Sequence, residues 1–185
     1  MENQDSKTAN LILESSLQSF FFDKLQEINK KSTRPASNQE IFYLSIVLDQ
    51  FGESKKFFDE EEGKPKEKML GMKLLETSQQ SESQRKRSLR EIGDTALFVC
   101  GYFHESLNSK LIDVGYYENL GQIAYRRLSN IIPQAYEVPK FFECMSDRFN
   151  SLSNLISIIS KDVFANDMNE MAYLIITDDK KIKAS

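Results

Sequence analysis

Hydrophobic residues recur at steps of three and four along most of this chain, which is the spacing of one face of an α-helix. The pattern is fullest in 89–128, where a polar break at 104–110 separates two stripes: Leu89, Ile92, Ala96, Val99 and Phe103, then Tyr117, Leu120, Gly121, Ala124 and Leu128. Glycines inside helices cost stability and are usually found where backbones pack closely. We therefore predict a central helical hairpin at 89–128, in which Gly101 lies near Tyr117. Gly121 should likewise lie near Leu97.

Further stripes predict helices on both sides of this hairpin. One helix should begin near Thr8, and a second should begin at Ser37, which forms a capping box with Glu40 and leads to a terminal glycine, Gly52. A short helix should follow at 69–75. A last element starts near 166, and its YLIIT run leaves both helix and strand open. Together these elements predict an all-α fold, an irregular bundle of six to seven helices that forms a single domain over 1–185.

Four segments are too polar to predict regular structure. We expect disorder at 1–6 and 179–185, and flexible connections at 59–66 and 77–88. The segment 77–88 could instead extend one of the neighbouring helices. A basic cluster, which could contact phosphates, begins within this segment and runs from Arg85 to Arg90. Because the cluster has no interleaved aromatic residues, a solvated helix start is the favoured interpretation.

The stretch 142–163 has the most regular periodicity in the chain. Apolar residues alternate at steps of three and four, as in the seam of a coiled coil, and include Phe142, Met145, Phe149, Leu152, Ile156 and Ile159. Such a seam can pack against a helix of the same chain or against a second copy. We predict one continuous helix here, and an interface made by these six residues in a homodimer or with another protein.

Composition and charge narrow the class of function. Hydrophobic residues make up 40% and charged residues 28% of the 185 residues, which is typical of a globular domain. The formal net charge of −4 disfavours a general polyanion binder, so we expect no nucleic acid partner. No apolar run approaches the roughly 20 residues of a membrane-spanning helix, and the first residues lack the pattern of a signal peptide. We therefore expect a cytoplasmic protein without a membrane partner.

Motifs of common catalytic and metal sites are absent from the sequence, including the P-loop, GxGxxG, CxxC, HExxH and GxSxG. With a single histidine, His104, the chain lacks the parts of a site with several histidine ligands. Cys100 and His104 are four residues apart and could chelate a metal, but only Cys144 and carboxylates such as Glu105 are left to complete four ligands. We favour a buried free thiol at Cys100 and predict no metal and no cofactor.

Asp94 is a carboxylate in an otherwise apolar helix, and burying it is costly unless it is paired or hydrogen-bonded. In the predicted hairpin it lies opposite 124–125, within reach of Arg126 or Arg127. The favoured interpretation is a structural ion pair or a carboxylate that is hydrogen-bonded by tyrosine. The alternative is a small-ligand pocket, where the carboxylate could bind a cation or act as a base. The candidate lining of that pocket is Asp94, Tyr102, Tyr116, Tyr117 and Tyr125.

The same region resembles a known family. The runs GDTALFVCGYF, SLNSKLIDVGYY and LGQIAY, within 89–128, are similar to the central segment of an uncharacterised family of small all-helical bacterial proteins with the pattern GDxxLFxxGxF…YY…AY. That family has an acidic residue before the Tyr-Tyr pair, where this chain has Gly115. The resemblance implies a bacterial source and a shared central segment, and it implies no activity.

These features favour a non-enzymatic cytoplasmic helical module that serves in interaction or regulation and associates with itself. The alternative is a small-molecule-binding protein or a cofactor-free enzyme, with its pocket at Asp94 and the neighbouring tyrosines. Enzyme activity stays open, although no recognisable motif supplies a nucleophile. A nucleic-acid binder that uses the basic cluster at 85–90 is the third and least favoured interpretation.

Overall fold

The computed structural model describes residues 17–52, 67–104, 114–132, 138 and 140–166. The α-helices in these residues are α2 (Leu17–Asn29), α3 (Asn38–Gly52), α4 (Glu67–Glu76), α5 (Glu82–Tyr102), α7 (Val114–Ile131), α8 (Phe141–Asp147) and α9 (Phe149–Asn166). A 3-10 turn, η2 (Thr77–Gln79), joins α4 to α5, and the described part contains no strand. The predicted all-α bundle is confirmed. Several predictions lie outside the described residues: the helix start near Thr8, the polar ends, the connection at 59–66 and the last element after 166.

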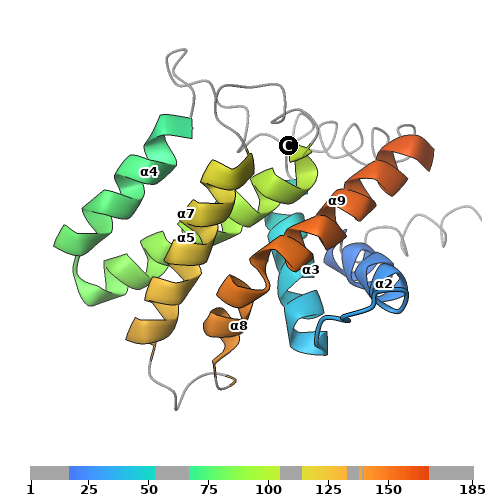
Figure 1. The fold of residues 1–185 in the computed structure, drawn as a ribbon, viewed down its shortest axis with the longest axis horizontal. Coiled ribbons are helices and arrows are strands. Elements are labelled where there is room, and N and C mark those ends of the chain that lie inside the picture. Colours follow the sequence, from blue (N-terminus) through green and yellow to red (C-terminus); the bar gives the residue numbers. More distant parts are fainter. Residues whose placement is uncertain (1–16, 53–66, 105–113, 133–137, 139, 167–185) are drawn as a thin grey trace, which may run out of the picture.

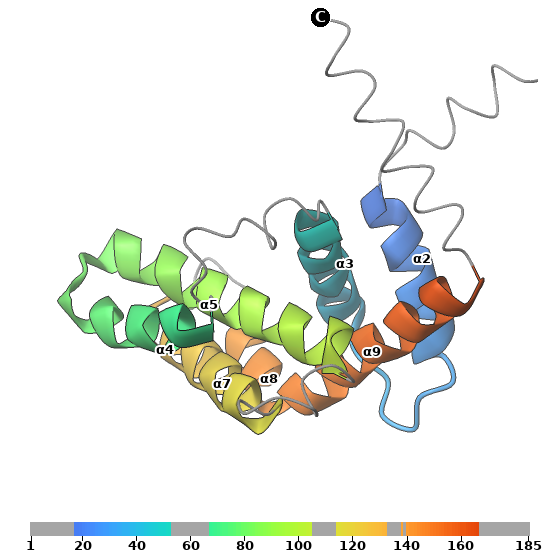
Figure 2. The ribbon, with the colours of Figure 1, turned by 90° about the horizontal axis from the view of Figure 1, so that it is seen from above.

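The helix α5 is the centre of the bundle. Figure 1 shows α7 and α9 in front of it, and Figure 2 shows α3 on its other side. Side chains of α5 are buried on nearly every face, among them Leu89, Ile92, Ala96, Leu97 and Phe98. A helix that is apolar nearly all round is expected to be surrounded by other helices, so the composition of α5 explains its place.

The helices α5 and α7 form the predicted hairpin, but its glycines meet other partners than expected. A Cβ atom at Gly101 would lie 2.5 Å from the Cβ of Ile156, so this glycine faces α9 rather than Tyr117. A Cβ atom at Gly121 would overlap the ring of Phe149, which also belongs to α9, and would lie 3.1 Å from the Cβ of Ala96 in α5, the residue before the predicted neighbour Leu97. The glycines therefore do permit close packing, but they admit a third helix against the hairpin.

The connection predicted to be flexible at 77–88 is ordered, and this prediction is wrong. Residues 77–79 form η2, and α5 begins at Glu82, so the segment extends a neighbouring helix, which was the alternative. A capping box starts α5, in which the backbone N–H of Ser81 donates to the side chain of Gln84. The side chain of Arg85 donates to the backbone oxygens of Thr77 and of Gln80, at 3.0 and 3.1 Å.

The stripe predicted as an interface is packed inside the single chain. Each of its six side chains is at most 2% exposed: Phe142, Met145, Phe149, Leu152, Ile156 and Ile159. The helix is also interrupted, because α8 ends at Asp147 and α9 begins at Phe149, with Arg148 between them. The stripe therefore belongs to the core, where it leaves no surface for a second chain. The homodimer itself stays a prediction and would need another surface.

Candidate functional site

Asp94 lies in the middle of α5 and is enclosed by side chains of neighbouring helices. The hydroxyl groups of Tyr43 in α3 and Tyr125 in α7 each donate a hydrogen bond of 2.7 Å to the same carboxylate oxygen, Oδ1. The ring of Phe142 packs against both tyrosines, with its centroid 5.7 Å from each of theirs. Asp94 is only 7% exposed. It is therefore a carboxylate hydrogen-bonded by tyrosine, which is one of the two arrangements that the sequence favoured.

Burial sets the protonation of this cluster. Loss of hydration raises the pKa of Asp94 from its ordinary value of 3.8 to about 6, although both tyrosine hydrogen bonds and the charge of Arg90 act in the opposite direction. Burial and the nearby carboxylate raise the pKa of Tyr43 and of Tyr125 far above the usual value for a phenol. Both tyrosines therefore stay protonated, and the carboxylate is the member of the cluster that titrates near neutral pH.

Of the five residues in the predicted ligand pocket, the structure brings together only Asp94 and Tyr125. Tyr102 stacks on a phenylalanine of its own helix, with ring centroids 4.9 Å apart. Tyr116 and Tyr117 lie in the first turn of α7, with ring centroids 5.5 Å from each other. These three tyrosines therefore do not surround the carboxylate.

The partners of Asp94 differ from the prediction in two further ways. Sequence reasoning missed Tyr43, whose only signal is a hydroxyl-bearing ring beside the apolar stripe of α3. Arg126 does not reach Asp94 but pairs with Asp147 at the surface, and Arg127 is exposed. An enclosed carboxylate with two donors from two other helices is suited to hold α3, α5 and α7 together. It is poorly placed to meet a ligand.

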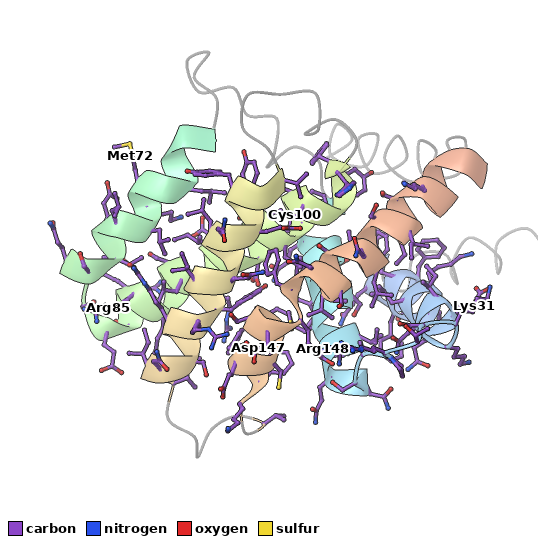
Figure 3. All side chains as sticks on the ribbon, in the orientation of Figure 1. Lys31, Met72, Arg85, Cys100, Asp147 and Arg148 are labelled. Carbon is purple, nitrogen blue, oxygen red and sulfur yellow. The ribbon has the colours of Figure 1, made fainter. Side chains whose placement is uncertain are left out.

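The cysteine residues offer no stronger candidate for a functional site than Asp94 does. The thiol of Cys100, labelled in Figure 3, is buried and lies 3.8 Å from the backbone oxygen of Val114. Burial raises the pKa of this thiol, so it stays protonated and unreactive. Cys144 is a free, exposed thiol on α8. Among the described residues, no group of three histidine, cysteine, aspartate or glutamate side chains could hold a metal ion.

A groove with a volume of about 790 Å³ lies between α2 and α9. Among the described residues, its lining includes one carboxylate, from Glu27, and five cationic side chains, from Lys24, Lys31, Arg34, Arg148 and Lys161. Ile28, Leu155 and Ile158 provide the apolar part of the lining, and Ile158 is 47% exposed. The groove therefore combines positive charge with exposed apolar surface, on a chain whose net charge is −4.

Arg148 joins the two walls of this groove (Figure 3). Its Nη1 lies 3.0 Å from Oε2 of Glu40, which is buried, and its Nη2 donates to the backbone oxygens of Arg34 and Pro35 at 2.9 and 3.1 Å. The same Glu40 forms the predicted capping box with Ser37, with hydrogen bonds of 2.7 and 3.2 Å, so that prediction is confirmed. One arginine therefore fixes the connection between α2 and α3 against the start of α9.

Sequence reasoning missed this groove. Its residues come from two distant segments, 24–34 and 148–161, and each cationic side chain taken alone is typical of a solvated helix face. Two residues of the basic cluster that the sequence did single out, at the start of α5, have partners within the fold. Lys86 pairs with Glu82 at 2.6 Å, and the guanidinium of Arg90 lies 5.4 Å from the ring centroid of Phe142.

In the part of the chain that the structure describes, the helices are too short or too polar for any one of them to cross a membrane. Comparison with known proteins finds no matching family model, no matching curated protein and no matching solved structure. The resemblance of the central segment to a bacterial family therefore stays a prediction, and the functional argument rests on the residues of this chain.

Proposed function

We propose that the chain is a non-enzymatic helical module that binds another protein through the groove between α2 and α9. One observation carries this proposal: in the groove, cationic side chains lie beside an exposed apolar side chain, that of Ile158, which is 47% exposed. Apolar surface surrounded by polar groups is typical of protein interaction sites. A regulatory role and a cytoplasmic location are the expectations that accompany this proposal.

The chemistry of the groove supports binding rather than catalysis. Its hydroxyl groups, from Ser32, Thr33 and Ser151, would need an adjacent base to act as nucleophiles. The lining described contains neither histidine nor cysteine, and its carboxylate, Glu27, is largely exposed and lies 4.0 Å from Lys31. An exposed carboxylate beside a lysine has none of the burial that tunes a catalytic base.

The alternative function, a small-molecule pocket at Asp94, has weaker support. The carboxylate is 7% exposed, and the hydroxyl groups of Tyr43 and Tyr125 occupy its neighbourhood. A ligand would have to displace two hydrogen-bond donors from the core before it met the carboxylate. Self-association stays part of the proposal, with the groove rather than the buried stripe as a surface on which a second copy could bind.

Photo-crosslinking tests the proposal at a chosen residue. A photoreactive phenylalanine analogue replaces Ile158 in the full chain, which is then irradiated in cells of its source. The control carries the analogue at Ile123, an isoleucine of α7 with a similar exposed fraction, 42%, outside the groove. We expect the analogue at position 158 to give a protein adduct of defined mass that is absent from the control.

The outcomes separate the interpretations. An adduct with a second copy of this chain would identify self-association through the groove, and an adduct with a different protein would identify an external partner. If position 158 gives no adduct, or if both positions give the same adducts, the groove is not the binding surface and the proposal fails.

A further inference from the structure

We infer that the groove between α2 and α9 takes an acidic peptide segment that carries an aliphatic side chain among its carboxylates. This inference rests on the proposed function and names the class of ligand. It follows from three features: the distribution of charge along the rim, the apolar residues beneath that rim, and the hydrogen bonds that fix its shape.

Two cations of the described lining, Lys31 and Arg34, can meet the carboxylates of a ligand. Arg148 is balanced by the buried Glu40, and Lys31 is weakly paired with Glu27 at 4.0 Å, where both side chains are mostly exposed. Such a surface ion pair contributes little to the stability of the fold, so Lys31 can exchange Glu27 for a carboxylate of a ligand. With exposed Arg34 beside it, the rim presents two cations within one short connection. A ligand with several carboxylates complements this rim.

The apolar residues of the groove indicate which side chain of the ligand lies between its carboxylates. Ile28 and Leu155 are mostly covered, whereas Ile158, in the same lining as the cations, exposes 47% of its surface. Burial of this aliphatic surface favours a leucine- or isoleucine-like side chain. Asn154 and Ser151, which are exposed on the same wall, can hydrogen-bond to a peptide backbone.

The rim is held in shape before any ligand arrives. The backbone oxygen of Arg34 accepts a hydrogen bond from Arg148, whose other nitrogen pairs with Glu40 in α3. The amide of Asn29 also donates to the backbone oxygen of Ala36 at 2.9 Å. A preorganised rim loses less conformational entropy on binding, which favours recognition of a defined segment.

A nucleic acid fits this groove less well. Sequence-tolerant binding of single strands relies on aromatic side chains that stack on the bases, and the described lining has aliphatic residues instead of rings. The chain also carries a net charge of −4, which opposes a long polyanion more than a short acidic peptide. We therefore assign the groove to a peptide, and a nucleic acid becomes an outcome of the test.

The test measures fluorescence anisotropy of a labelled synthetic peptide in which leucine residues alternate with pairs of glutamates. Two comparison probes are the same peptide with glutamine in place of glutamate, and an oligothymidylate of equal charge. We expect the full chain to bind the glutamate peptide, to bind the glutamine peptide at least about tenfold more weakly, and to lose affinity as salt rises, because exposed ion pairs are screened.

Matched variants locate the binding. Lys31→Glu should weaken binding of the glutamate peptide about threefold to tenfold, whereas Lys30→Glu, an equal charge change at an exposed residue outside the lining, should have little effect. Ile158→Ser should weaken binding about tenfold, and Ile123→Ser should not. All four side chains are substantially exposed or outside the core, so circular dichroism should show that each variant folds.

The inference is overturned if Lys31→Glu and Lys30→Glu have equal effects, if the glutamine peptide binds as tightly as the glutamate peptide, or if the oligothymidylate binds more tightly than either. Failure here is distinguishable from failure of the proposed function. If Ile158 crosslinks a partner in cells while the acidic peptide does not bind, the groove is a binding surface for a ligand of different chemistry.

Discussion

Replacing Asp94 with asparagine changes the charge of the buried cluster but keeps its shape. The amide oxygen of Asp94→Asn can still accept the hydrogen bonds of Tyr43 and Tyr125, whereas the amide does not ionise. The wild-type carboxylate does ionise, in surroundings that disfavour its charge. The substitution therefore removes a pH-dependent part of the free energy of unfolding while the packing of the core is preserved.

The size of that part follows from the pKa of Asp94. The unfolded chain titrates near the ordinary value of 3.8, and burial raises the pKa in the fold to about 6. The fold therefore prefers the protonated carboxyl group. Its stabilising contribution is fully present below about pH 4 and is lost as the pH rises through about 6. A pKa difference of this size corresponds to about 3 kcal/mol.

Urea unfolding followed by circular dichroism, at about pH 4 and at about pH 7, measures this contribution. We expect the stability of Asp94→Asn relative to wild type to rise by about 2 kcal/mol between the two pH values, because part of the full difference already appears at pH 4 and the other titrating groups are common to both proteins. Asp147→Asn, at an exposed carboxylate, is the matched control and should change by less than about 1 kcal/mol.

Two results would refute this reasoning. If the relative stability of Asp94→Asn is the same at both pH values, burial does not govern the carboxylate. If it falls with rising pH, the two tyrosine hydrogen bonds stabilise the anion more than burial destabilises it. Tyr43→Phe gives an independent check, because loss of one donor should make the decline in stability above about pH 4 steeper than in wild type.

Three further predictions concern the core. Gly101→Leu should lower the free energy of unfolding by at least about 1–3 kcal/mol, because even a Cβ atom would meet Ile156 at 2.5 Å; an unchanged melting temperature would contradict this packing. Arg148→Ala should cost about 2 kcal/mol or more in urea unfolding, because it leaves the buried Glu40 unpaired, whereas Arg126→Ala, at an exposed ion pair, should cost less than about 1 kcal/mol. Ile156→Asp should give an unfolded chain by circular dichroism, since that side chain is buried in the monomer; a folded protein of lower mass in light scattering would show instead that the stripe joins two copies.

Much of the fold could be predicted because burial follows periodicity. The periodicity of the stripe from Phe142 to Ile159 indicates a face that other residues cover, and the side chains of this stripe are buried, but inside the single chain and not in the predicted interface. The pattern of a stripe does not predict which element covers it, however, and here the covering elements are helices of the same chain. Gly101 illustrates the same limit, since a glycine in a helix predicts a close neighbour without naming it. The neighbour is Ile156, which is far away in the sequence.

The sites were harder to predict for a related reason. Asp94 was recognisable as a costly carboxylate in an apolar helix, and the hairpin register brought Tyr125 into consideration. Tyr43 lies 51 residues away in a helix with no predicted register to α5, so its hydrogen bond could not be foreseen. The groove was missed because it depends on α2 and α9 lying side by side. The helical structure of the segment 77–88 was predictable in part, since Ser81 and Gln84 have capping-box spacing.

Amide hydrogen exchange, read by mass spectrometry with and without saturating glutamate peptide, tests most directly the claim that the groove between α2 and α9 is the binding surface. We predict slower exchange in the peptide-bound protein over 24–34 and 151–161, the two walls of the groove, with little change in α4 and α7. Slower exchange in α4 or α7 that leaves these two walls unaffected, or no change anywhere at saturation, would contradict the claim.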